Sequence, residues 1–86
     1  MVHQITMKRT ATIDLHGMRS ADAECELKCF LDKLPPHIDL VEVIHGIGSG
    51  ILKQLVAEFY HCKIQDRIQC IGNPGQTNYY IKAEAR

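Results

Sequence analysis

The 86-residue chain lacks the features that mark several specialised classes of protein. It has no tryptophan, no excess of one charge and no long apolar run. Lys plus Arg and Asp plus Glu number 10 each, so the composition gives no sign of a strongly basic nucleic-acid-binding surface. No stretch reaches the ~18 apolar residues of a membrane span, and the N-terminus lacks the apolar core of a signal peptide. We therefore expect a cytoplasmic protein with no membrane partner.

The cysteines are too few and too widely spaced for a disulfide-stapled secreted scaffold. None of the four forms a C-x-x-C pair. Cys25 and Cys29 could share one helix face, but two thiols without a histidine partner are a weak signal for zinc. We expect reduced thiols in a cytosolic protein.

The length predicts one small domain with one core. Residues 1–9 have no clear period and are expected to form a tail or a short edge strand, which leaves a single domain over 10–86. Within that domain, strand-like and helix-like apolar patterns alternate. Strands are predicted at 10–15, 40–44, 64–71 and 77–83, and the apolar run at 40–44 is typical of a strand buried on both faces.

The first predicted helix has a start signal, an apolar stripe and a stop signal. Ser20 is a good N-cap, and Asp22 in the first turn suits the helix dipole. Pro35 and Pro36 end the helix because proline lacks the backbone amide. The apolar stripe consists of Ala23, Leu27, Phe30, Leu31 and Leu34.

The second predicted helix carries Leu52, Leu55, Val56 and Phe59. In the turn at 73–75, Pro74 sets one central position and Gly75 is free to take a positive φ at the next. The order β-α-β-α-β-β predicts an α/β fold: a two-layer sandwich with a four-stranded mixed sheet.

Two segments carry most of the functional information: Ile13-Asp14-Leu15-His16-Gly17 and Ile44-His45-Gly46-Ile47-Gly48-Ser49-Gly50. Each is an apolar run that ends in histidine and glycine and precedes an amphipathic helix. In a right-handed β-α-β unit, both histidines lie at the carboxyl ends of parallel strands, the edge where open α/β sheets bind ligands. A glycine-rich loop opening a helix at that edge suits phosphate binding.

These motifs, L-D-x-H-G and H-G-x-G-x-G, resemble those of the Smr (small MutS-related) domain family, and the resemblance extends over residues of about 10 to 83. The segment 73–77 also looks like the closing glycine-threonine segment of the family. Two departures are Ile13 in place of leucine and Ile47 where many members have lysine. The resemblance implies a fold similar to the C-terminal domain of translation initiation factor three. Some members nick DNA or cut RNA, and others are the terminal domain of larger MutS-like proteins.

The resemblance and the chemistry together nominate Asp14, His16 and His45 as catalytic residues. Histidine titrates near pH ~6.5 and can act as general acid or base, with Asp14 orienting His16 and fixing its tautomer. Each residue also has a structural alternative. Asp14 could hydrogen-bond the turn, and His45 could be a strand-end imidazole satisfied by the backbone of the glycine loop.

Substrate phosphate is expected on the loop of Gly46, Gly48, Ser49 and Gly50. Arg19, Lys53 and Lys82 are candidate phosphate contacts, although surface cations are more often simply solvated. Of the adjacent Tyr79 and Tyr80, at least one is expected in the core because neighbouring strand residues point oppositely.

The leading hypothesis is an endonuclease that nicks DNA or cleaves RNA. RNA cleavage needs no metal because the ribose 2′-hydroxyl is the nucleophile. DNA cleavage requires attack by water, for which Asp14 and His16 could hold Mg²⁺ or another divalent cation. The alternatives are a non-catalytic nucleic-acid or ribosome-binding module, and a protein that binds a small phosphorylated metabolite at the same loop.

Overall fold

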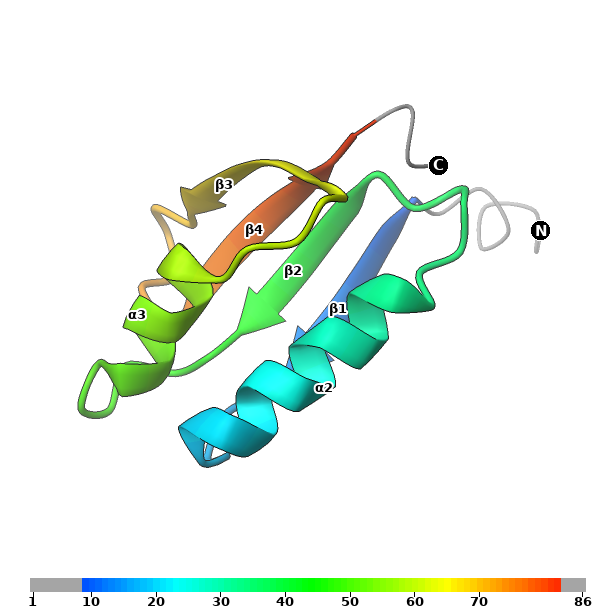
Figure 1. Cartoon of the computed structure of the whole chain (residues 1–86). Helices are drawn as coiled ribbons and strands as arrows, with labels where there is room; N and C mark the ends of the chain where they lie inside the picture. The colour runs from blue at the N-terminus through cyan, green and yellow to red at the C-terminus, as the bar shows by residue number, and fades with distance from the viewer. Residues whose placement is uncertain (1–8, 83–86) are drawn as a thin grey trace, which may run out of the picture.

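The computed structural model describes residues 9–82, so the tail or edge strand expected at 1–9 lies almost wholly outside the described residues. The elements follow the predicted order (Figure 1). They are β1 (Thr10–Asp14), α2 (Ser20–Asp32), β2 (Leu40–Ile44), α3 (Ile51–Glu58), β3 (Ile64–Gln69) and β4 (Gln76–Ile81). Over residues 9–82, neither helix has the length and apolar character needed to cross a bilayer.

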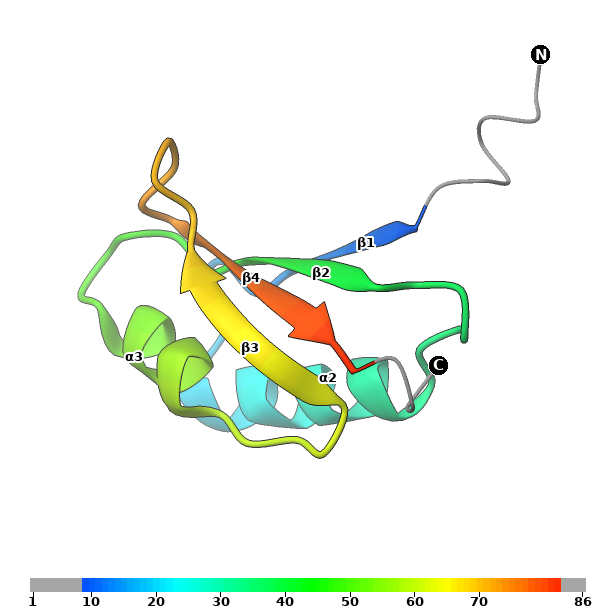
Figure 2. The same cartoon turned by 90° about the horizontal axis from the view of Figure 1, so that it is seen from above.

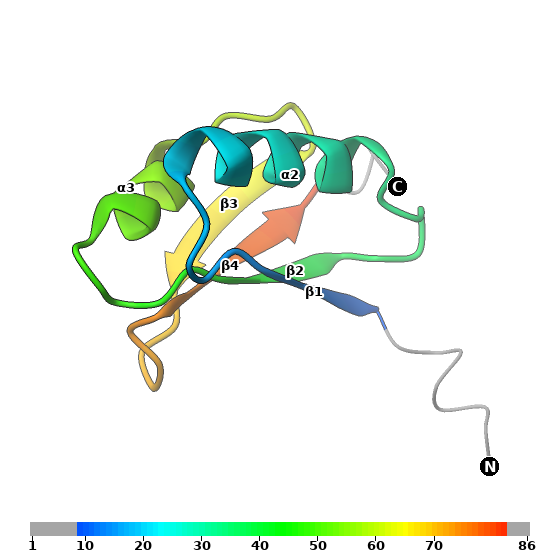
Figure 3. The same ribbon diagram turned by 90° about the horizontal axis from the view of Figure 1, so that it is seen from below.

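The sheet is mixed and has the strand order β1-β2-β4-β3. β1 and β2 are parallel, and β4 lies antiparallel between β2 and β3. Both helices cover the same face of this sheet, which leaves the other face open (Figures 2 and 3). The predicted α/β fold with a four-stranded mixed sheet is therefore confirmed.

Burial along β2 corrects one expectation. Val41 and Val43 are fully buried under the helices, but Glu42 and its neighbours on the open face are only partly covered. The strand alternates because helices pack against one side of the sheet only. The core facing the helices consists of Leu15, Ala23, Leu27, Leu31, Ile38, Val41, Val43, Val56, Ile64, Tyr79 and Ile81. Tyr80, in contrast, lies exposed on the open face, as the alternation with Tyr79 predicts.

The start of α2 also differs from the prediction. Ser20 is the first helical residue and Arg19 is the N-cap, with no side-chain capping bond. The Arg19 carbonyl starts the helix by accepting a 2.8 Å hydrogen bond from the Ala23 amide. The helix ends at Asp32, ahead of Pro35, as the proline signal requires.

Two cations at β3 bind the carboxyl ends of the helices. Lys63 Nζ donates to the Leu31 carbonyl at 2.7 Å, at the end of α2. The Arg67 guanidinium donates to the Ala57 carbonyl at 3.0 Å and to the Phe59 carbonyl, at the end of α3. Cations at these positions satisfy carbonyls that have no partner within the helix and match the helix dipole. With their carboxyl ends anchored at β3, the helices direct their amino ends to the opposite end of the domain (Figure 1).

Candidate functional site

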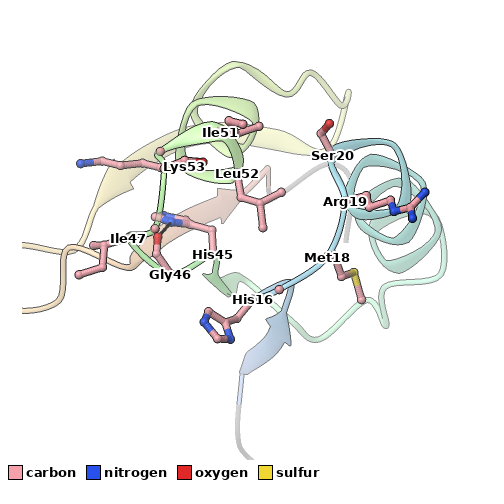
Figure 4. A pocket seen from close by; sticks show the side chains of 14 residues that line it. His16, Met18, Arg19, Ser20, His45, Gly46, Ile47, Ile51, Leu52 and Lys53 are labelled. Atoms are coloured by element: carbon pink, nitrogen blue, oxygen red, sulfur yellow. Dashed lines mark hydrogen bonds between the residues drawn. The ribbon is translucent and has the colours of Figure 1, made fainter.

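A cavity of about 490 Å³ lies at the carboxyl ends of β1 and β2, where the two helices begin (Figure 4). Its lining consists of residues 16–20 and 45–53, which contain both histidine-glycine motifs. The parallel register pairs Asp14 with Ile44, so the two strands end side by side. The predicted juxtaposition of His16, His45 and the glycine loop at one edge of the sheet is therefore confirmed. Asp14 is not part of this lining.

His16 is exposed and rests against the backbone of Gly46. A Cβ added to Gly46 would lie 2.7 Å from His16 Cδ2, so the ring would have to shift. Gly46 also has a φ of +75°, a conformation that favours glycine. Gly46 thus provides a flat support for the imidazole.

Asp14 contacts the backbone of His16. Its Oδ1 accepts a 2.9 Å hydrogen bond from the His16 amide. In residues 9–82 no hydrogen bond joins the Asp14 carboxylate to the His16 imidazole. The contact between Asp14 and the His16 amide therefore does not fix the tautomer of His16, contrary to the expectation. The geometry corresponds to the alternative in which Asp14 stabilises the turn at the end of β1.

His45 is buried, with 3% of its surface exposed, and both ring nitrogens have partners. Nδ1 donates to the Gly46 carbonyl at 2.7 Å, because a carbonyl oxygen can only accept. Nε2 shares a 2.9 Å hydrogen bond with the Thr77 hydroxyl. This arrangement holds the ring by both nitrogens and matches the satisfied-imidazole alternative. His45 lines the cavity, but neither nitrogen is free for substrate.

The turn at 73–77 packs directly against the glycine loop. The Gly75 carbonyl accepts hydrogen bonds from the amides of His45 at 2.8 Å and Gly46 at 3.0 Å. A Cβ on Gly75 would lie 3.2 Å from Gly46 Cα. The predicted positive φ at Gly75 is wrong, since positive φ among the described glycines occurs at Gly17, Gly46 and Gly50. Gly75 is needed because two backbones meet, a contact between distant segments that local turn rules do not reveal.

The remaining lining favours anions. Gly50, with φ of +87°, is the N-cap of α3. Its carbonyl accepts the first hydrogen bond of the helix, from the Gln54 amide, so the amides of 51–53 have no partners within the helix. α2 also begins at the cavity, so two helix dipoles direct positive ends toward it. Arg19 lies on the α2 side and Lys53 on the α3 side, and no carboxylate lines the cavity (Figure 4). Lys82 follows β4 at the opposite edge, where Ile81 bonds Asp39, so it is not a contact of this site.

The donors for a resident metal ion are too sparse at this edge. Among residues 9–82, no group of three or more His, Cys, Asp or Glu side chains could hold a metal. Asp14 and His16, the predicted pair, form at most two ligands. All four cysteines are free, as expected, and Cys25, Cys29 and Cys62 are exposed.

Comparison with known proteins agrees with the two motifs. The family model described as Smr domain matches residues 13–74. Endonuclease MutS2 of Lactococcus lactis subsp. cremoris is 37% identical over 54 residues, which is 62% of this chain and 7% of that protein. Endonuclease MutS2 of Streptococcus thermophilus is 40% identical over 50 residues, or 57% of this chain and 6% of that protein. The chain thus corresponds to a small part of these relatives.

The fold has a close structural counterpart. The crystal structure of the Smr domain of Thermus thermophilus MutS2 superposes with a TM-score of 0.77 at 22% identity. The match covers 84% of this chain and 98% of that domain. At this identity the likeness concerns the fold.

Proposed function

Because the chain belongs to the Smr domain family, and its curated relatives are named endonucleases, we propose that it is an endonuclease whose substrate is RNA. The observation that carries the proposal is a single exposed imidazole, His16, at the edge of a cavity suited to anions. One acid–base group suffices for RNA, since the substrate brings its own nucleophile in the 2′-hydroxyl.

The substrate phosphate would bind between the two helix amino ends. Backbone amides of 51–53 lie in the first turn of α3, with Arg19 on the α2 side of the cavity and Lys53 on the α3 side. As negative charge builds on the phosphoryl oxygens in the transition state, these fixed donors stabilise it. The loop residues Gly48 and Ser49 are exposed, so a phosphodiester can approach the backbone closely.

His16 would act as the general base. Its free ring nitrogen takes the proton of the 2′-hydroxyl, and the 2′-oxygen attacks the adjacent phosphorus. The bond from phosphorus to the 5′-oxygen breaks, and that oxygen takes a proton from water. The products are a 2′,3′-cyclic phosphate and a 5′-hydroxyl end. Such acid–base assistance contributes ~10²- to 10⁴-fold to the rate.

His45 has a positioning role in this proposal. It binds the Gly46 carbonyl, and Gly46 supports the His16 ring. Thr77, on β4, holds the other side of the His45 ring through the hydrogen bond between its hydroxyl and Nε2. These contacts restrict the imidazole to one region of the cavity edge, and catalysis depends steeply on such placement.

The test uses labelled RNA and DNA of one sequence, single- and double-stranded, with EDTA or with Mg²⁺. We expect RNA to be cut in EDTA with cyclic phosphate ends, and 2′-O-methyl substitution to abolish cutting. Equal cutting of DNA would refute the role of the 2′-hydroxyl and favour water attack assisted by a divalent cation.

A second candidate is a nucleic-acid or ribosome-binding module without catalysis. The observation in its favour is that both nitrogens of His45 are engaged, which leaves one free imidazole at the site. Binding of RNA without cutting under every metal condition would select this candidate.

A further inference from the structure

Exposed apolar side chains gather at the cavity. Seven large hydrophobic residues are exposed in the described part of the chain, and three of them, Met18, Ile47 and Ile51, line this one site. Ile47 and Ile51 are 63% and 60% exposed. In Figure 4 they flank the start of α3, while Met18 lies on the α2 side. Apolar surface gathered in this way marks a binding site for an apolar group.

Cations that can attract phosphate also line this cavity. Arg19 and Lys53 are the cations of its lining. Away from it, α2 carries four carboxylates and one lysine: Asp22, Glu24, Glu26, Asp32 and Lys28. The open face of the sheet carries Asp14, Glu42 and Asp66 on its strands and no lysine or arginine. A long run of phosphates would therefore meet negative charge on either side of the site.

From these observations we propose that the cavity binds an unstacked base of single-stranded RNA, and that duplex RNA is disfavoured. The inference rests on the proposed function. A duplex buries the faces of its bases and presents phosphates and groove edges, so Ile47 and Ile51 would lose water without gaining an apolar partner. A single strand can turn one base onto these side chains while its flanking phosphates contact Arg19 and Lys53.

The size of the cavity agrees with this occupant. Its volume of about 490 Å³ falls in the ~300–1,000 Å³ range of sites that enclose small organic groups. Such a cavity accommodates one base with its sugar and phosphate. Ile47 and Ile51 thus act as specificity residues, and they leave the acid–base chemistry of His16 unchanged.

Binding of uncleavable 2′-O-methyl RNA to the intact chain tests the proposal. One sequence is used as a single strand and as a duplex, and affinity is read by fluorescence anisotropy. We expect the single strand to bind at least ~10-fold more tightly. Ile47→Ala and Ile51→Ala should each weaken single-strand binding ~3- to 10-fold and leave duplex binding unchanged, as loss of an apolar contact with the base requires.

Ile71→Ala is the matched control, because Ile71 is 99% exposed and lies outside the cavity lining. It should change neither affinity. Ile47→Lys should raise duplex affinity and steepen the log–log salt dependence of duplex binding by ~0.9, since one more phosphate is neutralised. Equal binding of single strand and duplex would overturn the inference, as would equal effects of Ile47→Ala and Ile71→Ala.

The experiments distinguish a failure of the base-binding inference from a failure of the proposed function. If RNA is cut but strandedness does not affect binding, only the specificity inference fails. If the single strand is preferred but unmodified RNA is never cut, catalysis fails and the base-binding site stands.

Discussion

The two β-α units of this domain share a sequence pattern but use their histidines differently. In the first unit, His16 follows β1 and is exposed at the edge of the cavity. In the second, His45 follows β2 and is 3% exposed, with both ring nitrogens bonded. The same combination of apolar strand, histidine and glycine thus yields one free imidazole and one that holds the loop.

The difference arises from the neighbours of each strand. β1 is an edge strand, so the segment after it has β2 on one side and solvent on the other. β2 lies between β1 and β4, and β4 brings Thr77 beneath His45 and Gly75 onto the loop. In this domain the exposed histidine is therefore the one that follows the edge strand.

The largest expected effect is the loss of RNA cleavage in His16→Ala. Removal of the general base should lower kcat by ~10²- to 10⁴-fold. The thermal midpoint should hardly change, because the side chain is exposed and contributes little to the core. Single-turnover rates and a melt monitored by circular dichroism measure the two quantities. A variant that cuts RNA at the parent rate would remove His16 from the mechanism.

Disturbing His45 should have the opposite result: a larger effect on stability than on the cleavage rate. Thr77→Val keeps the shape of the side chain but leaves His45 Nε2 buried without its hydrogen-bond partner, which should cost about 1–3 kcal/mol of unfolding free energy. kcat should fall less than in His16→Ala, since His45 acts through Gly46. Urea unfolding and cleavage rates separate the two effects. If Thr77→Val retained full stability while losing as much rate as His16→Ala, His45 would be catalytic and our comparison of the two units would be wrong.

Gly46→Ala should affect both units because Gly46 lies between the two histidines. Its positive φ makes alanine cost about 1–2 kcal/mol, and the added methyl would push the His16 ring off its support. We expect lower stability together with a lower kcat. Gly72→Ala is the control, since Gly72 lies outside the cavity lining, has no positive φ and has nothing within 4 Å of an added Cβ. Equal behaviour of the two variants would show that the Gly46 support is unimportant.

The fold was largely predictable from local pattern. The alternation at β1, the stripe on α2 and the prolines after it each act over a few residues, so the element order and the meeting of both motifs at one edge follow from the sequence. The motif spacing then identified the loop. Boundaries shifted by one or two residues, as at Ser20, where the chain has a choice of first turn.

The roles of the two histidines required tertiary contacts that no local pattern contains. Thr77 is separated from His45 by 32 residues, and only the antiparallel return of β4 brings them together. The same holds for Gly75, which is glycine because it meets Gly46. His61, without any motif in the sequence, proves to bond Asp32 across 29 residues.

That third histidine gives the smallest predicted effect. Lys28 donates to the Asp32 carboxylate at 2.9 Å and His61 at 2.8 Å, and these two hydrogen bonds lower the pKa of Asp32 from 3.8 to about 2. A carboxyl whose pKa is lower in the folded state stabilises the fold above its unfolded pKa. The contribution is therefore present above about pH 4 and is lost as the pH falls toward 2.

Asp32→Asn should lower the thermal midpoint slightly at pH 6, and the gap from the parent should close between pH 4 and 2. Glu24→Gln, also on α2, is the control, because no hydrogen bond or ion pair of Glu24 is found within residues 9–82. Its melting profile should run parallel to that of the parent across this range. A gap for Asp32→Asn that stays constant down to pH 2 would mean that the carboxylate gains nothing from Lys28 and His61.

RNA cleavage at pH 6 should be unchanged in both variants, since neither residue lines the cavity. The hydrogen bond between Asp32, at the end of α2, and His61, after α3, would then affect stability alone. RNA cleavage would still depend on the exposed imidazole of His16.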